Sequence, residues 1–256
     1  MNEVDCVTAA GEMTKKAIDD IPVGGFIYLE RNLETEAQVK EMLSNVQSYS
    51  MNRIEVPAFL CIDEEGGSVA RLSGTGRFDI PSIENMSEVG QNNDYERAKE
   101  VGNVIGDYLS DFGFNVDFAP VADVLTNSEN KVVKTRAFGN DAKKVSDMAL
   151  LVKQGLEEKG IYATYKHFPG HGSTTDDTHA GYACSNSTLE ELKNCELIPF
   201  ETAIKEGVSF IMVGHISLPN VIGDDTPASL SKCIIDDFLA NHLLYILIEM
   251  PVCHLQ

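Results

Sequence analysis

The sequence predicts an α/β fold of the (β/α)8 barrel class. Short, nearly continuous apolar runs alternate with longer amphipathic segments, as expected for parallel strands that are covered on both faces and joined by helices. Polar residues such as Asp63, Asp123, Lys166, His167 and His215 follow most of these runs. In a barrel the carboxyl ends of all strands face one site. An open doubly wound sheet would need a glycine-rich phosphate loop after its first strand, and GFIYLERN is not such a loop.

The strands are predicted from runs rich in β-branched and aromatic residues. Five runs qualify: residues 25–29, 58–62, 116–119, 163–167 and 209–214. A sixth strand is counted beside them, and a further apolar run covers residues 245–248. This rhythm, without a low-complexity segment or a linker, predicts that residues 1–256 form a single domain.

The helices are predicted from apolar residues spaced at helical periods. They cover residues 36–48, 95–112, 141–159 and 189–206, with another over residues 8–20. Ser187 or Thr188 can cap the helix at 189–206, and Glu190 or Glu191 can reach back to it. Gly160 and a second glycine at position 207 follow two of these helices, where a left-handed residue commonly ends a helix.

The composition limits the classes of function. The net charge of −20 argues against binding nucleic acid, which requires clustered Lys and Arg. No apolar run approaches the roughly 20 residues of a membrane helix, so no membrane span is expected. The six cysteines contain no CxxC pair and are expected to be free thiols. The first residues show no signal peptide, which predicts a cytoplasmic protein if this N-terminus is native and permits a secreted or lipid-anchored one if upstream sequence is missing.

The stretch KHFPGHGSTTDDTH, residues 166–179, is dense in proton-handling groups. His167 and His171 have the spacing of two zinc ligands on a helix, but Pro169 and the flanking glycines make a helix implausible. A loop site formed by these two histidines with His179 and Asp176 is one alternative, and a hydrogen-bonded structural loop is another. A carboxylate beside an imidazole raises its pKa and fixes its tautomer, so Asp177-Thr178-His179 also predicts a proton donor.

A second motif, IDEEGGSVARL, covers residues 62–72. Asp63 stands where a strand ends, Gly66-Gly67 permits a tight turn, and Arg71 returns toward the same region. A surface turn with a salt bridge is the alternative to a binding site. Arg136, in RAFG, is a lone arginine before a turn and carries little weight by itself.

Six stretches together resemble glycoside hydrolase family 3. IDEEGGSVARL, VDFAPVADV, RAFG, KHFPGHGSTTDDTH, MVGHISLP and PASLS occur in the family's order and approximate spacing, over roughly residues 22–243. They are most similar to its β-N-acetylglucosaminidase (β-N-acetylhexosaminidase) branch. The resemblance implies a (β/α)8 barrel enzyme that removes terminal β-linked N-acetylglucosamine with retention of configuration. It implies no cofactor and no metal, and its expected partner is an N-acetylglucosamine-containing oligosaccharide or cell-wall fragment.

The resemblance also implies roles for individual residues. The positions matching those that bind the sugar are Asp63, Arg71, Arg136, Lys166 and His167. His179 matches the general acid/base of this branch, and Asp177 matches its dyad partner. A histidine in this role departs from the usual pair of carboxylates in glycosidases.

The end of the chain departs from the family. The similarity is lost after IIDDFLANHL, and an ungapped count places the family's nucleophilic aspartate at Val252. Glu249 is a candidate to replace this aspartate, but it lies three residues earlier, about 10 Å away along a strand. By the same resemblance, the first strand and the last strand or strands of the barrel are expected to be missing. The resemblance therefore implies a chain truncated at both ends, without its nucleophile and inactive as written.

Three other functions remain open. A non-catalytic N-acetylglucosamine-binding module would keep the same pocket without turnover. A family 3 β-glucosidase would usually lack the Asp-x-His triplet, which disfavours it here. A metal-dependent hydrolase would use the histidines of residues 166–179 as ligands.

Overall fold

A computed structural model describes residues 7–21, 23–174, 183–240 and 245–248, and the side chains of residues 237–240 and 245–248 are left out of the description. These residues contain one parallel sheet of six strands, with the order β1-β2-β5-β6-β8-β10. The strands are β1 (Gly25–Tyr28), β2 (Phe59–Ile62), β5 (Val116–Asp117), β6 (Tyr162–Phe168), β8 (Phe210–Val213) and β10 (Tyr245–Ile248). All five predicted strands are confirmed, and the apolar run at residues 245–248 forms a sixth.

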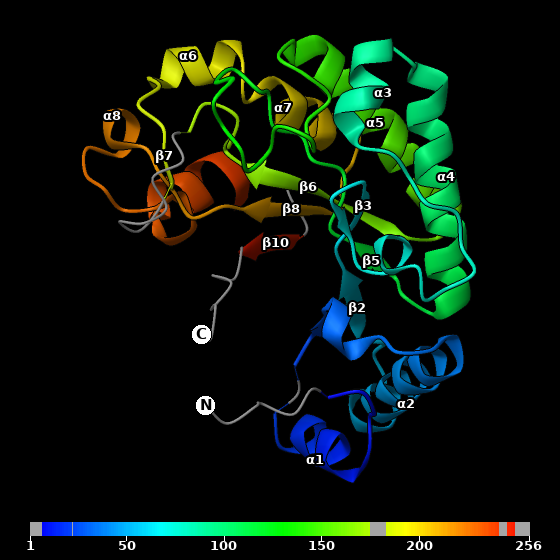
Figure 1. Ribbon diagram of the computed structural model, residues 1–256. Helices are drawn as coiled ribbons and strands as arrows, with labels where there is room; N and C mark the ends of the chain where they lie inside the picture. Colours follow the sequence, from blue (N-terminus) through cyan, green and yellow to red (C-terminus); the bar gives the residue numbers. More distant parts are fainter. Residues whose placement is uncertain (1–6, 22, 175–182, 241–244, 249–256) are drawn as a thin grey trace, which may run out of the picture.

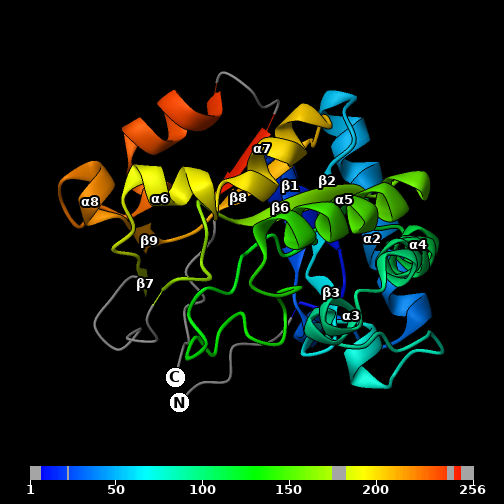
Figure 2. The same ribbon diagram turned by 90° about the horizontal axis from the view of Figure 1, so that it is seen from above.

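The strands lie side by side in the order in which they occur along the chain. Each pairs in parallel with the next, from β1 with β2 through to β8 with β10. A doubly wound sheet reverses its strand order at a switch point, and the described part of this sheet has no such reversal. The sheet curves, with helices along its outer side (Figures 1 and 2). The result is a parallel half-barrel.

Helices connect the strands. They are α1 (Glu12–Asp20), α2 (Glu36–Ile54), α3 (Met86–Asn92), α4 (Tyr95–Phe112), α5 (Ala142–Glu158), α6 (Leu189–Asn194), α7 (Ile198–Lys205) and α8 (Pro219–Ile222). Four begin with side-chain caps, at Thr35, Asp94, Asp141 and Thr188, each accepting from a backbone N–H within the first turn. Thr188 completes the expected capping box with Glu191. Short helical turns cover Glu30–Asn32, Ser73–Thr75 and Ala228–Leu230, and a π-helical segment covers Cys233–Ala240.

The prediction of a single helix over residues 189–206 is wrong. The structure has two helices, α6 and α7, with Cys195 between them in a non-helical conformation at φ −143° and ψ −86°. Pro199 lies in the first turn of α7. A proline has no backbone N–H to bond back into a preceding turn, and it disfavours helical geometry in the residue before it. It is therefore tolerated where a helix begins and would break a continuous one.

The sheet is apolar on both faces. Leu60, Ile62 and Ile211 point outward and pack in the main core with the helices. A smaller cluster on the inner face contains Cys61, Val116, Phe118, Phe210 and Met212, with Phe59 packed against it. The Phe59 ring meets the Phe210 ring edge-on at 5.1 Å between centroids. Burial on both faces explains why the strands read as continuous apolar runs.

Shorter strands border the sheet. A hairpin joins β3 (Glu64–Gly66) to β4 (Val69–Ala70), and β7 (Ala183–Cys184) pairs in parallel with β9 (Ile216–Ser217). Within the hairpin, Gly66 and Gly67 have φ of 89° and 55°, as the predicted tight turn requires. Cys61, Cys184 and Cys195 are not disulfide-bonded. Across the described ranges, no helix combines the length and the apolar character needed to span a membrane.

Candidate functional site

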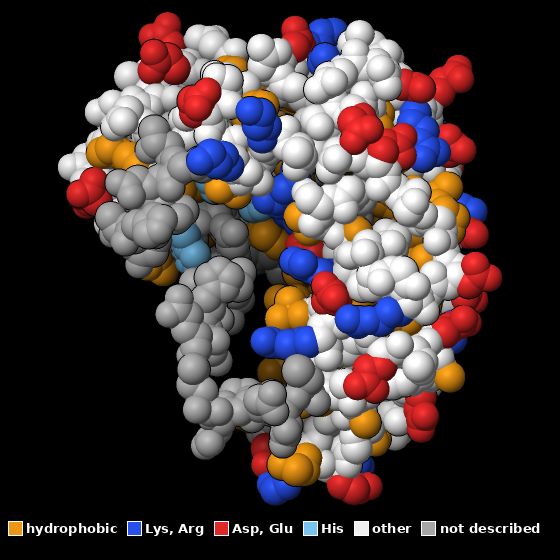
Figure 3. Space-filling view, viewed as in Figure 1, with side chains coloured by type: hydrophobic (Ala, Val, Ile, Leu, Met, Phe, Trp, Pro, Cys, Tyr) orange, Lys and Arg blue, Asp and Glu red, His pale blue; other side chains and the backbone are white. Residues whose placement is uncertain are grey.

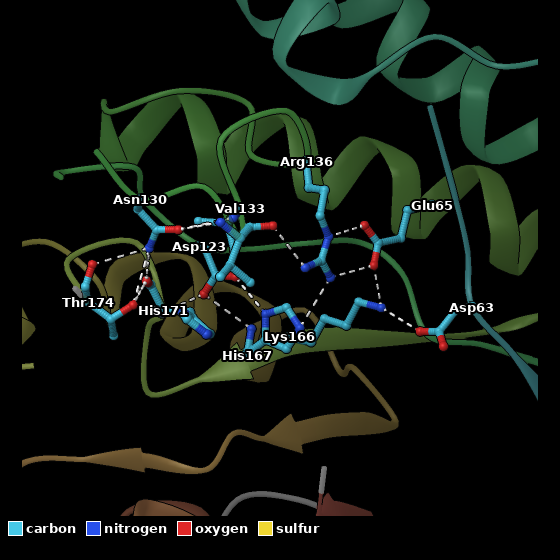
Figure 4. Close-up of polar contacts among 11 residues, drawn as sticks. Asp63, Glu65, Asp123, Asn130, Val133, Arg136, Lys166, His167, His171 and Thr174 are labelled. Atoms are coloured by element: carbon cyan, nitrogen blue, oxygen red, sulfur yellow. Dashed lines mark hydrogen bonds and ion pairs between the residues drawn. The ribbon is translucent and has the colours of Figure 1, made fainter. Parts of the chain in front are cut away.

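Charged side chains from separate parts of the chain meet at the carboxyl ends of β2 and β6. Asp63 directly follows β2, while Lys166 and His167 lie near the end of β6. Because the strands are parallel and close in the sheet, their ends lie at one edge, and Figure 4 shows the side chains converging there. We call Asp63, Glu65, Asp123, Arg136, Lys166 and His167 the strand-end cluster. Acidic, basic and histidine side chains gather around the hollowed middle of this face in Figure 3.

Lys166 lies at the centre of the strand-end cluster. Its Nζ is 2.8 Å from Asp63 Oδ1 and 2.5 Å from Glu65 Oε1. Only 1% of Lys166 is exposed, so this ammonium is almost entirely removed from water. A buried ammonium is strongly destabilising without such partners, and the two carboxylates supply the opposite charge.

Arg136 reaches the cluster from the loop between β5 and α5. Its guanidinium forms a two-point contact with Glu65, with Nε 2.8 Å from Oε2 and Nη2 2.7 Å from Oε1. Nη1 also donates to the Val132 carbonyl at 3.3 Å. The planar fork of arginine matches a carboxylate in this arrangement and fixes the direction of both groups.

Asp123 orients His167. The Asp123 Oδ2 atom is 2.7 Å from His167 Nδ1, and Oδ1 accepts the backbone N–H groups of His167 and His171 at 3.2 and 2.7 Å. The other ring nitrogen, Nε2, is 3.3 Å from Arg136 Nη2. A guanidinium has only donors, so this contact requires Nε2 to accept and Nδ1 to carry the proton toward Asp123.

The charges in the cluster stabilise one another. Burial raises the pKa of Asp63, but the neighbouring cations Lys166, Arg71 and Arg136 together outweigh it, so the net pKa is below the usual value. Burial and the cations Lys166 and Arg136 compete in the same way at Glu65, whose pKa is also lowered. For Lys166, burial lowers the pKa, but the carboxylates of Asp63 and Glu65 raise it by more, so the net pKa is above the usual value. All three side chains are therefore charged at neutral pH.

Asp123 has the same balance with an imidazole as its partner. Burial raises its pKa, while His167 and the hydrogen bonds around the carboxylate lower it to about 2. The carboxylate is therefore ionised at any pH at which the protein is expected to work, and it keeps its three hydrogen bonds.

Arg71 and Asp63 form the open side of the site. Their closest approach is 3.6 Å, between Arg71 Nη2 and Asp63 Oδ2, and the side chains are 33% and 21% exposed. Arg71 returns toward Asp63 through the β3–β4 hairpin, as predicted, and its backbone N–H donates to the Asp63 carbonyl at 3.3 Å. This loose, accessible pair contrasts with the tight, buried contacts around Lys166.

Glu64 anchors the hairpin from the other side. Its carboxylate accepts from the backbone N–H groups of Leu72 and Ser73 at 2.8 and 2.9 Å, and from the Tyr108 hydroxyl at 2.9 Å. Its own N–H donates to Asp117 Oδ1 at 3.0 Å. Burial and the nearby Glu64 charge raise the pKa of Asp117 well above its usual value. Glu64 thus fixes the backbone between Asp63 and Glu65, whose side chains enter the site.

Asn130 ties two loops together beside the cluster. Its Nδ2 donates to the His171 carbonyl at 2.8 Å, and its Oδ1 accepts from the N–H groups of Val132 and Val133. The Thr174 hydroxyl is 2.7 Å from His171 Nδ1. The loop that carries Arg136 and the loop that follows β6 are thereby fixed relative to each other (Figure 4).

The five residues predicted to bind the sugar lie together in the structure: Asp63, Arg71, Arg136, Lys166 and His167. The predicted acid/base pair, Asp177 and His179, lies outside the described residues, as do Asp176, Glu249 and Val252.

Two members of the cluster, Glu65 and Asp123, were not predicted as site residues. Asp123 is among the polar residues that follow the predicted strands, and Glu65 lies within the IDEEGGSVARL motif after the strand that ends at Ile62. Their position after a strand was the available signal, but nothing in the local sequence shows which cation each one contacts.

Of the four proposed metal ligands, two lie within the described residues and two lie outside them. His167 and His171 lie side by side with ring centroids 5.7 Å apart. Among the residues described, no three His, Cys, Asp or Glu side chains form a group that could hold a metal ion. His215, which follows β8, bonds through Nδ1 to the Ser229 hydroxyl. The remaining proposed ligands, His179 and Asp176, are not described, so the metal alternative stays an untested prediction.

Comparisons with known proteins point in one direction. The family described as glycosyl hydrolase family 3 N terminal domain matches residues 1–245. A β-hexosaminidase of Nitrosomonas eutropha is 32% identical over 224 residues, which cover 86% of this chain and 62% of that protein. The chain spans roughly half the length of the curated relatives it matches, from 39% to 64%.

Solved structures agree with the sequence comparisons. A glycoside hydrolase family 3 β-N-acetylglucosaminidase from Paenibacillus sp. superposes with a TM-score of 0.86 at 35% identity, covering 96% of this chain and 46% of that one. NagZ from Neisseria gonorrhoeae, solved in complex with N-trifluoroacetyl-D-glucosamine, superposes with a TM-score of 0.82 at 27% identity, covering 92% of this chain and 68% of that one.

Proposed function

This chain belongs to glycosyl hydrolase family 3, and on that premise we propose that its strand-end cluster binds a terminal β-linked N-acetylglucosamine residue. We further propose that residues 1–256 form one partial domain of the (β/α)8 barrel type. The substrate class is an N-acetylglucosamine-containing oligosaccharide or cell-wall fragment. The names of the related proteins support this class, since they are β-hexosaminidases and β-N-acetylglucosaminidases.

The observation that carries the proposal is the set of buried ion pairs around Lys166 in the strand-end cluster. Lys166 and Arg136 share the carboxylate of Glu65, and Lys166 also contacts the partly exposed Asp63. Buried ion pairs contribute little net stability, because desolvation offsets most of their attraction. Charged groups fixed at the carboxyl ends of strands are instead suited to charge-assisted hydrogen bonds with the hydroxyls of a neutral ligand.

Three residues of the strand-end cluster, Lys166, Asp63 and His167, can each make a further contact with a sugar. Lys166 has three N–H donors, of which the described residues engage two, at Asp63 and Glu65. Asp63 is 21% exposed and is free to accept from sugar hydroxyls on its solvent side. His167 has protein partners at both ring nitrogens, so we propose that it meets the sugar at Nε2, where its contact with Arg136 is long at 3.3 Å.

For catalysis we propose the His179–Asp177 pair as general acid/base. In the retaining reaction a carboxylate attacks the anomeric carbon while the acid donates its proton to the leaving oxygen. The same group then takes a proton from the water that releases the sugar. The counted nucleophile position is Val252, which has no nucleophilic oxygen, so we propose that the chain as printed binds the sugar and is inactive or nearly inactive in hydrolysis.

Sugar binding can be tested with N-trifluoroacetyl-D-glucosamine, whose fluorine signal reports binding in an NMR titration. We expect saturable binding to the wild-type chain and binding about 10- to 100-fold weaker for Asp63→Asn, because a charged hydrogen-bond partner is removed. Asp224→Asn is the matched control, since Asp224 is exposed and caps a turn at Thr226. Absence of wild-type binding, or equal binding by Asp63→Asn, would refute the proposed site.

Catalysis is tested in parallel with a chromogenic β-N-acetylglucosaminide, comparing the wild-type chain with His179→Ala. Slow hydrolysis that disappears in the variant would support the dyad and direct a search for the nucleophile, beginning at Glu249. Binding without any hydrolysis would favour the second candidate, a non-catalytic N-acetylglucosamine-binding module. The specific observation behind that candidate is that the five residues proposed to bind the sugar lie together while position 252 holds a valine.

A further inference from the structure

We propose that Glu65 is a positioning residue that sets Arg136 and Lys166 in the direction from which both meet the sugar. This inference rests on the proposed function and extends it to a residue that the sugar itself does not reach. Only 2% of the Glu65 side chain is exposed, and both of its carboxylate oxygens face cations of the cluster. Glu65 therefore acts through these two neighbours.

The geometry of Glu65 connects two cations that come from different elements. Arg136 lies on the loop before α5 and contacts both carboxylate oxygens, at 2.8 and 2.7 Å. Lys166 lies on β6 and approaches Oε1 at 2.5 Å, so one oxygen serves both cations. Glu65 itself is held on β3 between Glu64, with its several hydrogen bonds, and the Gly66 turn. The carboxylate thus transmits the position of the hairpin to both cations.

The remaining contacts of the two cations are weaker. Without Glu65, Arg136 would keep its long contacts with His167 Nε2 and the Val132 carbonyl, each at 3.3 Å. Lys166 would keep Asp63, which is partly exposed and also faces Arg71 at 3.6 Å. Two cations that share a carboxylate would then face each other in a site with little water. We expect them to separate, and the sugar would lose its preorganised donors.

The charge of Glu65 also affects the pKa of Lys166. Among the described residues, the titratable groups that act on Lys166 include Asp63 after β2, Glu65 on β3, Asp117 on β5 and Arg136 before α5. The carboxylates of Asp63 and Glu65 outweigh burial and Arg136, so they raise the pKa of Lys166. Removing the charge of Glu65 must lower that pKa. Sugar binding that depends on the Lys166 ammonium would then decline at a lower pH on the alkaline side.

The chain contains a matched control for a guanidinium–carboxylate pair outside the cluster. Arg97 donates to Glu84 through Nε and Nη2, both at 2.7 Å, in the same two-point geometry. The Glu84 and Arg97 side chains are 31% and 26% exposed. Loss of this pair removes the same type of contact without altering the groups around Lys166. A difference in sugar binding between the Glu65→Gln and Glu84→Gln variants is therefore due to the place of Glu65 in the site.

The experiment is a fluorine NMR titration with N-trifluoroacetyl-D-glucosamine from pH 6 to pH 10, using wild type, Glu65→Gln, Glu65→Asp and Glu84→Gln. For Glu65→Gln we expect binding at least about 30-fold weaker, because a buried charge pair loses one partner. Wild-type binding should show no alkaline decline up to pH 10, because the pKa of Lys166 is raised above its ordinary 10.5, whereas any residual binding by Glu65→Gln should decline at lower pH than wild-type binding does. Glu65→Asp keeps the charge on a shorter side chain, so we expect intermediate binding without a decline up to pH 10. Glu84→Gln should bind as wild type does.

The outcomes separate this inference from the proposed function. If the wild-type chain binds no probe, the proposed function fails, and so does a role for Glu65 in it. If wild type binds and a folded Glu65→Gln variant binds equally well with the same pH profile, only the inference about Glu65 is overturned. If Glu65→Gln does not give a cooperative thermal transition, Glu65→Asp decides: binding equal to wild type overturns the inference, and weakened binding supports it.

Discussion

Replacing Asp123 with asparagine should destabilise the fold in a pH-dependent way. The substitution keeps the size of the side chain and removes its charge. It leaves an amide where a carboxylate accepts from His167 Nδ1 at 2.7 Å and from the His167 and His171 backbone N–H groups at 3.2 and 2.7 Å. One end of an amide is a donor, so it cannot accept at all three positions in the same way.

The magnitude follows from the pKa of Asp123. Its value falls from 3.8, the ordinary value of an aspartate, to about 2 in the folded protein. At about 1.4 kcal/mol per pKa unit, the folded state favours the ionised carboxylate by about 2 kcal/mol. Because the folded pKa is the lower one, this contribution is fully present above about pH 5 and is lost as the pH falls through about 2. At pH 7 we therefore expect Asp123→Asn to lower the free energy of unfolding by about 2–4 kcal/mol.

The assay is urea denaturation of both proteins between pH 7 and the lowest pH at which both still unfold cooperatively. The difference between them should shrink as the pH falls below about 4, because Asp123 then takes up a proton in the unfolded wild-type chain while it stays ionised in the folded protein until about pH 2. Asp141→Asn is the control: Asp141 caps α5 at 2.8 Å from the Lys144 N–H, and asparagine caps a helix about as well. A loss below about 0.5 kcal/mol at pH 7, or a loss that does not change with pH, would refute this reasoning.

Two further predictions concern the scaffold of the site. Tyr108→Phe removes the hydroxyl that donates to buried Glu64 at 2.9 Å, and we expect thermal unfolding to show a loss of about 1.5–3 kcal/mol; an unchanged melting temperature would contradict the role given to this bond. Gly90→Ala places a Cβ 1.8 Å from the Phe138 carbonyl oxygen, so we expect a loss of at least about 2 kcal/mol. Gly24→Ala, which meets no atom within 4 Å, should melt close to wild type and serves as its control.

Much of the fold could be predicted because its signals are local. The helix α4 has the predicted bounds, and α5 begins one residue after the predicted start at Asp141, which caps it. Apolar runs gave the strands because both faces of the sheet are buried. The prediction failed between α6 and α7, where the apolar period continues through residues 195–197 but Pro199 begins a new helix.

Part of the candidate site could also be predicted from the sequence, and part could not. Parallel strands predict that residues at their carboxyl ends share one edge, so Asp63, Lys166 and His167 could be grouped from the sequence. Glu65 and Asp123 could be noted as polar residues after strands, but their partners could not be assigned.

By itself, the sequence determined the strands of the main sheet, most of the longer helices, the parallel arrangement and the family to which the chain belongs, because periodicity and motifs are local features of the sequence. Only the tertiary structure decided which charges meet. Asp123 orients His167 from 44 residues away, Glu65 grips Arg136 from 71, and Asp63 holds Lys166 from 103. Such contacts depend on how strands and loops pack in space, and charge pairs are defined by distances of a few ångströms that no local pattern encodes.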